Sequence, residues 1–361
     1  MKRKILILNR RDLKNPLSGG AEIYTHEIFR RLCDEYDITH FSSAFEGCRK
    51  VESIDGIKYI RKGGEFTMHF YAFLYTLLNY RFFDLIIDEF NGLGMMTFFF
   101  KRSIILIHQL YDEFWVAFFG IFGYPFKIIE KILLRFYRNK PAITVSNSTK
   151  EDLIDFGFRA DNITIVFNGI DFVKMDVKKG FKPVLMYLGR MRKTKNPEDA
   201  IRAYLQAKEK IDNLIIHMVG DGEELDYLKQ QYQEEEGILF HGFVSEEEKY
   251  KLLRKASVLL VPSIREGWGQ IVIQANMMGT PVIGYDVAGI RDSVRHENTG
   301  FLVDKHNPSE MSNRICDLLT NPVILKKMSD SALEYSSTFS WEKSADGMRK
   351  TLNEIFLQIG S

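Results

Sequence analysis

The sequence predicts an α/β protein with two doubly wound domains, each built around a parallel sheet. The first observation is length, because 361 residues suit two domains better than one. The second is that short apolar runs alternate with segments of helical spacing, which is the pattern of βαβ units. The third is that this alternation starts near residue 5 and starts again near residue 184.

The first series opens with a strand, a glycine loop and a helix. Residues 5–8 form a compact apolar run before Asn9, which is typical of a buried parallel strand. Gly19 and Gly20 follow, and residues 21–32 carry apolar side chains at helical spacing. Such glycines let the backbone approach a ligand, and the helix start offers N–H groups to an anion. A glycine pair alone is more often an ordinary tight turn before a helix.

The second series repeats the pattern over a longer stretch. Predicted strands cover residues 184–188, 214–219, 258–261 and 281–284, and predicted helices cover 197–207, 223–232, 246–255 and 270–278. The join lies near residues 168–182, where Asn-Gly, Lys-Lys-Gly and a proline interrupt the chain. We therefore expect domains of residues 1–167 and 168–341. Because ligands of open α/β sheets bind outside the carboxyl ends of the strands, we expect the site in a cleft between two facing domains.

Composition narrows the class of protein. Hydrophobic residues make up 45% and charged residues 27%, which is an ordinary globular mix. The net charge of +1 gives no general attraction to nucleic acid. Cys33, Cys48 and Cys316 lack the spacing of metal ligands and indicate reduced residues in a cytoplasmic protein. The uncharged stretches 66–80 and 114–126 are shorter than the roughly 20 residues of a spanning helix, so we expect no membrane crossing.

Two cations follow the first strand of the second series. Arg190 and Lys195 lie five residues apart in the segment LGRMRKTKNPED, in a loop that Pro197 closes. At the carboxyl end of a strand, a bidentate guanidinium and a point charge could neutralise a diphosphate. The plainer interpretation is a solvated basic loop, and it suits the neighbouring Arg192 and Lys193.

The most specific segment is VPSIREGWGQIVIQANMMGTPVIG, residues 261–284. Glu266 follows a strand in a loop bounded by Gly267 and Gly269, and a helix then starts near Gln270. A carboxylate there can accept hydrogen bonds from sugar hydroxyls, and the helix start can hold phosphate or sugar oxygens. A plain acid that complements the helix dipole is the alternative.

Together these three segments closely resemble glycosyltransferase family 4, a large retaining family with the GT-B fold. Further matching segments cover residues 144–158, 163–171, 218–229, 238–248, 288–304 and 339–345. The resemblance is strong from Thr144 onward and at Gly19–Gly20, and weak between Val51 and Tyr137. It implies that the C-terminal helix, residues 342–361, crosses back to the first domain.

The resemblance also implies site roles. Gly19 and Gly20 approach the phosphate and sugar of a nucleotide-sugar donor, while Arg190 and Lys195 grip its diphosphate and Glu266 binds sugar hydroxyls. The other implied donor-binding positions are Phe243 and Val244, whose backbone receives the base, and Gly267, Trp268, Gly269, Gln270 and Ile271. His108, after the strand-like run 104–107, falls where the family keeps an active-site histidine. A strand-end histidine with a structural hydrogen bond is its alternative.

One position departs from the family pattern of Glu, seven residues, Glu. Here the pattern is Glu266, seven residues, Gln274. The second acid of the family holds the ribose, and an amide keeps hydrogen-bonding capacity but loses the charge. We expect weaker donor binding at Gln274, and the change also supports a rival interpretation, a non-catalytic glycosyltransferase-like subunit of a heteromeric enzyme.

For the family, transfer retains the anomeric configuration, and diphosphate leaves from the face that the acceptor attacks. Cationic side chains and helix starts then stabilise charge, and neither a metal nor another cofactor is expected, in keeping with the absence of an Asp-x-Asp motif. A nicotinamide-dependent oxidoreductase is a second rival. It is disfavoured because no GxGxxG follows the first strand.

The segment YPFKIIEKILLRFYRNK, residues 124–140, predicts a basic amphipathic helix. Lys127, Lys131, Arg135 and Arg138 recur at spacings of four, four and three. Such a helix could lie on an anionic leaflet, here the inner face of the plasma membrane, or could be an ordinary helix with a solvated basic face. Membrane contact would suit a glycan or lipid-linked acceptor in surface polysaccharide or glycolipid assembly.

Overall fold

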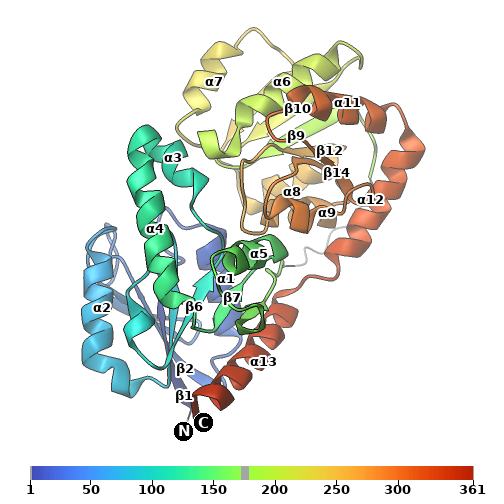
Figure 1. The fold of residues 1–361 in the computed structure, drawn as a ribbon. Coiled ribbons are helices and arrows are strands. Elements are labelled where there is room, and N and C mark those ends of the chain that lie inside the picture. Colours follow the sequence, from blue (N-terminus) through green and yellow to red (C-terminus); the bar gives the residue numbers. More distant parts are fainter. Residues whose placement is uncertain (1, 172–178, 361) are drawn as a thin grey trace. The chain divides into compact units, whose positions relative to one another are not determined.

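The structure, a computed structural model, describes residues 2–171 and 179–360. The chain divides into two compact units, Met1–Gly169 with Ser340–Ser361, and Ile170–Phe339. Residues 172–178 of the predicted join lie outside the described residues. Each unit is an α/β layer structure with its own sheet, as the sequence predicts (Figure 1).

The first unit is built on a sheet in the order β3-β4-β2-β1-β5-β6-β7-β8. Its strands are β1 (Arg3–Leu8), β2 (Tyr36–Ser42), β3 (Val51–Ile54), β4 (Ile57–Arg61), β5 (Leu85–Glu89), β6 (Ser103–Ile107), β7 (Ala142–Thr144) and β8 (Ile163–Ile165). All neighbours pair in parallel except β3 and β4, which form an antiparallel hairpin at the edge. Ile5 to Leu8 of β1 are completely buried, which explains their unbroken apolar run.

Helices cover this sheet on both faces (Figure 1). They are α1 (Gly20–Arg30), α2 (Met68–Asn79), α3 (Glu113–Phe119), α4 (Gly123–Tyr137), α5 (Asn147–Asp155) and α13 (Trp341–Gly360), with short 3-10 turns η1 (Tyr80–Phe82), η2 (Thr97–Phe99), η3 (Gly120–Phe122) and η4 (Ala160–Asn162). Leu134 and Tyr137 of α4 pack with Ile105 of β6 in one buried cluster. Met68 and Ala72 of α2 belong to a second cluster.

The C-terminal helix α13 belongs to the first unit and packs against α1. The Arg3 guanidinium lies 4.3 Å from the centre of the Phe356 ring, and the Tyr36 ring stacks on the same ring at 6.0 Å. The Arg349 Nε donates to Glu35 Oε1 at 2.7 Å. The end of the chain is therefore fastened beside its first strand.

The second unit has a parallel sheet in the order β11-β10-β9-β12-β13-β14. Its strands are β9 (Val184–Leu188), β10 (Ile215–Val219), β11 (Ile238–Gly242), β12 (Val258–Val261), β13 (Val282–Tyr285) and β14 (Gly300–Val303). Its helices are α6 (Pro197–Lys208), α7 (Leu225–Gln231), α8 (Glu246–Lys255), α9 (Gln270–Met277), α10 (Ile290–Ser293), α11 (Pro308–Leu319) and α12 (Pro322–Ser336), with the turn η5 (Lys193–Lys195).

Element bounds differ from the predicted ones by a few residues. The helix predicted to start at residue 223 starts at Leu225, because Glu224 N–H instead donates to Met191 O at 2.9 Å. The strand predicted from residue 281 starts at Val282, since proline has no N–H to donate. Cys33, Cys48 and Cys316 are all free thiols. No helix of the described residues is long and apolar enough to span a bilayer.

Candidate active site

In the second unit, the strand order reverses beside β9, whose neighbours are β10 and β12. A crevice forms at such a switch point, outside the carboxyl ends of the strands. The loop after β9 carries Arg190 and Lys195, and the loop after β12 carries Glu266. The topology therefore places three of the predicted residues on the two loops that flank this crevice.

Side-chain contacts join the two loops directly. Lys195 Nζ forms an ion pair with Glu266 Oε1, and Ser263 Oγ donates to the same oxygen at 2.7 Å. Ile264 N–H also donates to Thr194 O at 3.1 Å, so the loops are joined by backbone as well. The Lys195 and Glu266 side chains are 19% and 15% exposed. The pair is partly withdrawn from water, but both side chains are still reachable from solvent.

The backbone around Arg190 is held from two sides. Tyr187 OH donates to Arg190 O at 3.0 Å, and Met191 N–H donates to Asp221 O at 2.8 Å. Gly220 permits the close approach of these loops, because a Cβ there would lie 1.8 Å from Gly189 O. Its φ of 132° also lies in the region that favours glycine. The Arg190 side chain itself is exposed at the strand end.

Two glycines allow the close backbone packing around Glu266. Gly269 is the N-cap of α9 with φ 77°, and no side chain of the described residues caps this helix. A Cβ on Gly289, which has φ 81°, would lie 2.2 Å from Glu266 O. Glu266 N–H in turn donates to Ala288 O at 3.0 Å. The carboxylate is thus presented from a tightly packed turn beside a helix start that suits an anion.

The remaining predicted donor-binding residues differ in how exposed they are to solvent. Phe243 follows β11 and is 86% exposed, and Val244 beside it is half-buried. Trp268 is buried against the Phe339 ring, with ring centres 5.3 Å apart, so only its backbone is placed to meet a ligand. Gln274 is half-buried one turn into α9. The predicted roles of Phe243, Val244, Trp268 and Gln274 stay predictions, as do those of Gly267, Gln270 and Ile271.

In the first unit, His108 directly follows β6, as the sequence predicts, and Glu89 ends the neighbouring strand β5. His108 Nε2 lies 3.7 Å from Glu89 Oε2, and the His108 ring meets the Tyr24 ring edge-on at 5.0 Å. Burial raises the pKa of the Glu89 carboxyl above its usual range. Sequence reasoning missed Glu89, although its place at a strand end is the kind of signal that identified His108.

The loop after His108 is anchored by another buried acid, Glu130 of α4. Its carboxylate accepts from Tyr111 N–H at 2.8 Å, Asp112 N–H at 3.0 Å and Trp115 Nε1–H at 2.9 Å. Burial raises the pKa of Glu130 as well. Glu130 could not be singled out from the sequence, because its partners lie 15 to 19 positions away.

Gly19 is the N-cap of α1, with Gly20 as the first helical residue. The Gly19 N–H donates to Glu22 Oε2 at 2.7 Å, so the helix uses this donor in its own cap. Any anion at this helix start would therefore be held by the N–H groups after Gly19. The predicted contact of Gly19 and Gly20 with a donor stays a prediction.

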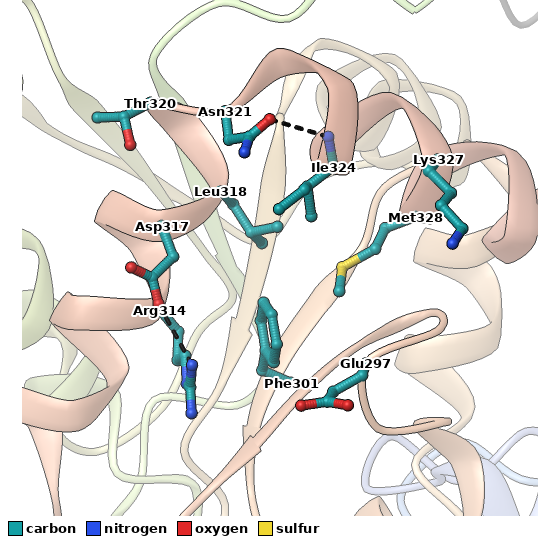
Figure 2. Close-up of a pocket in the computed structure, with 10 residues that line it drawn as sticks. All are labelled: Glu297, Phe301, Arg314, Asp317, Leu318, Thr320, Asn321, Ile324, Lys327 and Met328. Atoms are coloured by element: carbon teal, nitrogen blue, oxygen red, sulfur yellow. Dashed lines mark hydrogen bonds and ion pairs between the residues drawn. The ribbon is translucent and has the colours of Figure 1, made fainter.

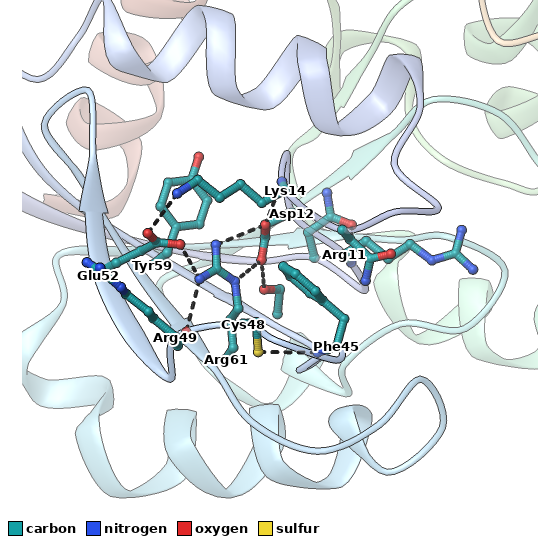
Figure 3. A network of polar contacts seen from close by, with 12 residues as sticks. Arg11, Asp12, Lys14, Phe45, Cys48, Arg49, Glu52, Tyr59 and Arg61 are labelled. Carbon is teal, nitrogen blue, oxygen red and sulfur yellow. Dashed lines mark hydrogen bonds and ion pairs between the residues drawn. The ribbon is translucent and has the colours of Figure 1, made fainter. Parts of the chain in front are cut away.

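The loop that leads to Gly19 is fixed by a buried polar network (Figure 3). Arg61 of β4 donates to both carboxylate oxygens of Asp12, at 2.6 and 3.1 Å, and both side chains are fully buried. Ser42 Oγ donates to Asp12 Oδ2 at 2.7 Å, and Arg61 also pairs with Glu52. This network ties the loop after β1 to β2 and to the β3–β4 hairpin.

A separate pocket of about 620 Å³ lies in the second unit (Figure 2). Residues of β14, α11, α12 and their adjoining loops line it, and the Arg314 guanidinium lies 4.9 Å from the centre of the Phe301 ring. None of the predicted site residues contributes to its lining. Among the described residues, no group of three or more His, Cys, Asp or Glu side chains is placed to hold a metal ion.

Two glycosyltransferase families match this chain, one over most of the first unit and one over most of the second. The family Glycosyltransferase Family 4 matches residues 18–174, and the family Glycosyl transferases group 1 matches residues 172–335. The chain is a glycosyltransferase of the group 1 and family 4 type. The two matches cover the Gly19–Gly20 loop and His108 in the first case, and Arg190, Lys195 and Glu266 in the second.

Relatives in sequence are distant. Two uncharacterized glycosyltransferases of Methanocaldococcus jannaschii match: one is 27% identical over 54% of this chain and 54% of its own, the other 24% identical over 94% and 96%. A D-inositol 3-phosphate glycosyltransferase of Streptomyces coelicolor is 28% identical over 44% of this chain. The chain spans about half the length of the first of these relatives and 38% of the length of the Streptomyces protein.

Solved structures share the fold over nearly the whole chain. Sucrose-phosphate synthase of Thermosynechococcus elongatus aligns with a TM-score of 0.80 at 18% identity, covering 99% of this glycosyltransferase and 100% of that chain. HepE of Anabaena, in complex with UDP-glucose, aligns with a TM-score of 0.73 at 18% identity, covering 97% and 99%. The predicted GT-B architecture, two Rossmann-like domains, is thereby confirmed.

Proposed function

We propose that this glycosyltransferase moves a sugar from a nucleotide-sugar donor to an acceptor, with retention of configuration and without a metal. The observation that carries the proposal is the Lys195–Glu266 ion pair at the crevice of the second sheet, with Arg190 on the same loop as Lys195. A cation and a sugar-binding carboxylate are what a diphosphate sugar needs at adjacent points. The UDP and UDP-glucose complexes of HepE support a donor of this class.

In the proposed reaction, the donor replaces the contact between Lys195 and Glu266. Lys195 and Arg190 turn to the diphosphate, and Glu266 accepts hydrogen bonds from sugar hydroxyls. The bond between the anomeric carbon and the phosphate oxygen breaks while the bond to the acceptor oxygen forms on the same face. The acceptor's proton passes to the departing phosphate oxygen, and the two cations neutralise the charge that develops there.

The acceptor is proposed to be a glycan or a lipid-linked sugar in surface polysaccharide or glycolipid assembly. Support comes from a solved lipopolysaccharide outer core galactosyltransferase, which aligns with a TM-score of 0.74 at 16% identity. The named inositol phosphate relatives show that acceptors vary among proteins of this type. The chain itself supports this proposal with an exposed apolar surface on its first unit.

That surface, the apolar face, is formed by large side chains of α2, α4 and their adjoining turns. Its exposed members are Phe66, Phe70, Leu77, Leu78, Phe82, Phe99, Ile121, Phe122, Tyr124, Ile128, Ile132 and Phe136. Ring contacts run across it, since Phe73 lies 6.5 Å from Phe99, and Phe98 stacks on Phe136 at 5.0 Å. Monomeric proteins rarely expose apolar side chains in such number unless they meet a partner or a membrane.

Charge favours an anionic membrane as that partner. The segments that form the apolar face also carry exposed basic residues, namely Arg81, Lys101, Arg102, Lys131, Arg135 and Arg138. Glu113 is the one exposed acid between residues 66 and 140, all of which are described. Lys127 differs from the other three predicted membrane residues, because it forms an ion pair with Asp112 at 2.7 Å. We therefore propose Lys131, Arg135 and Arg138, rather than all four, as the lipid-facing charges of α4.

A donor screen tests the proposed reaction. The intact chain is incubated with a panel of nucleotide sugars, and melting temperature and release of nucleoside diphosphate are measured. At least one donor should raise the melting temperature and release its diphosphate. Glu266→Ala should lower that release by about 100-fold or more, the scale on which one transition-state contact is felt. Glu236→Ala, at an exposed acid of the same unit, should leave it unchanged.

Two results would count against the reaction. If Glu266→Ala turns over every donor as fast as the unmodified chain, Glu266 does not bind the sugar. If no donor is bound or consumed by the folded chain, the rival interpretation of a non-catalytic subunit, first suggested by Gln274, is favoured.

A further inference from the structure

Glu89 is a buried acid that the proposed reaction does not use. Its carboxylate is completely buried at the end of β5. One oxygen, Oε1, accepts from Thr25 Oγ1 at 2.6 Å, and the other, Oε2, accepts from Asn9 Nδ2 at 2.7 Å. An ionisable group held away from water in this way needs a compensating function or partner.

The third neighbour of Glu89 is the imidazole of His108. His108 Nε2 lies 3.7 Å from Glu89 Oε2, which is too long for a hydrogen bond but short enough for a small rotation to close. The same Nε2 is a buried atom with no hydrogen-bond partner among the described residues. Thr149 Oγ1 donates to the His108 backbone oxygen at 3.2 Å, so the main chain is held here and only a side-chain rotation is needed to close the gap.

Topology places this group at the crevice of the first sheet. The strand order reverses beside β1, which pairs with β2 on one side and β5 on the other. Asn9 follows β1, Glu89 ends β5, and the bond between them crosses this switch point. Thr25 lies in α1, the helix that starts at Gly20. Glu89 therefore links the glycine-led helix to the predicted active-site histidine within one unit.

We propose that Glu89 is the positioning residue of His108. Its carboxylate accepts the hydrogen on Nε2 and so selects the tautomer in which Nδ1 is the acceptor nitrogen of the ring. Nδ1 can then take a hydrogen bond from a hydroxyl of the bound sugar. This inference rests on the proposed transferase reaction only for the task of His108. The link between the two side chains stands on the contacts themselves.

Glu89 does not act on substrate itself, because its side chain has no exposed surface that a substrate could reach. Asp88, the preceding residue of the same strand, is a buried acid with a purely structural role. It is also completely buried, and it accepts from Met95 N–H at 3.0 Å, Thr97 Oγ1 at 2.8 Å and Tyr137 OH at 2.6 Å. No histidine is among these partners, so Asp88 serves as a matched control.

The test reads the tautomer of His108 by nitrogen NMR on the full chain labelled with ¹⁵N-histidine, with His108→Asn used to assign the signals. The unmodified chain should show His108 with its hydrogen on Nε2, and Glu89→Gln should shift these signals towards a mixture of tautomers. Asp88→Asn should leave them unchanged. Glu89→Asp replaces this variant if Glu89→Gln does not fold. It keeps the charge but moves it back by one methylene, and it should shift the His108 signals in the same direction by a smaller amount.

The steady-state kinetics of the same variants are the second measurement that tests the inference. Glu89→Gln should lower kcat by about 10-fold or more, the scale seen when a metal-binding histidine loses its carboxylate partner, with a smaller change in KM for the donor. Native kcat together with native His108 signals in Glu89→Gln would overturn the inference. Native turnover in His108→Asn would instead remove His108 from the proposed reaction, and the NMR signals would still report whether Glu89 orients the ring.

Discussion

At the scale of single residues, polar side chains that are buried and paired hold the loops of the first unit in place. The Asp12–Arg61 pair is the clearest example, because both members are fully buried and joined by two hydrogen bonds (Figure 3). Burial by itself would raise the pKa of Asp12, but hydrogen bonds from Arg61 and Ser42 outweigh it and the pKa is lowered from 3.8. The charged form of Asp12 is thus favoured by folding.

This pair gives a stability prediction. Arg61→Met leaves the Asp12 charge buried without its partner and should lower the free energy of unfolding by about 3–5 kcal/mol, measured by urea denaturation near neutral pH. Lys50→Met, at an exposed lysine of the same region, should change it by no more than about 0.5 kcal/mol. An Arg61→Met variant as stable as the unmodified chain would show that the pair does not hold the loop.

The same pair predicts a dependence on acid. The folded-state pKa of Asp12 lies below its unfolded value, so the stability that it contributes is complete above about pH 4 and is lost as pH falls further. In Arg61→Met, the cause of the lowered pKa is removed, and this part of the acid sensitivity should disappear. Urea denaturation repeated between pH 5 and about pH 3 measures the difference.

Residues of this kind could not be predicted from the sequence. Arg190, Lys195 and Glu266 each follow an apolar strand, so their place at a strand end was visible in the order of residues. Asp12 and Arg61 are 49 positions apart, and Asn9 and Glu89 are 80 apart. Which of these residues pair depends on which strands become neighbours in the sheet. The local spacing of apolar residues does not reveal the order of the strands.

At the scale of elements, strands with unbroken apolar runs were predicted best. β9 and β12 have the predicted bounds, and so does α8, which Ser245 caps by accepting from Glu248 N–H at 3.2 Å. The β3–β4 hairpin was missed, although Asp55 and Gly56 between two alternating runs are a recognised hairpin signal. Both residues have positive φ, 49° and 86°, as that turn requires.

The helix α4 was predicted, but which of its side chains face solvent was not. The sequence suggested a basic face, and the structure shows that Ile128, Ile132 and Phe136 are exposed as well. Their exposure arises because Glu130, Leu134 and Tyr137 fill the buried side of the helix. The outward side is therefore apolar with basic flanks, which suits insertion at a membrane surface.

Co-sedimentation with vesicles tests this surface. The combined change Ile128→Gln, Ile132→Gln and Phe136→Gln should abolish binding to vesicles rich in anionic phosphatidylglycerol. Gln at Lys131, Arg135 and Arg138 should weaken it on the order of 100-fold, at about 1 kcal/mol per charge. Val323→Gln, at an exposed apolar residue of the second unit, is the control. Unchanged binding by the apolar variant would refute the membrane proposal.

At the scale of the whole molecule, two sheets of the same kind carry two different polar groups at their switch points. The second sheet presents Lys195 and Glu266 in contact, and the first presents Glu89 beside His108. The fold, and the places of Arg190, Lys195 and Glu266 after their strands, were predictable because strand, loop and helix follow one another in sequence. The first site was only partly predictable, since the resemblance is weakest between Val51 and Tyr137, where most of it lies.

The central claim is that Lys195 and Glu266 release each other to hold a nucleotide-sugar donor. A crystal structure of the chain with a bound, uncleaved donor tests this claim directly. We expect diphosphate oxygens within hydrogen-bond distance of Lys195 Nζ and the Arg190 guanidinium, and a sugar hydroxyl on the Glu266 carboxylate. A donor bound elsewhere, such as in the pocket of Figure 2, with the Lys195–Glu266 pair intact, would contradict it.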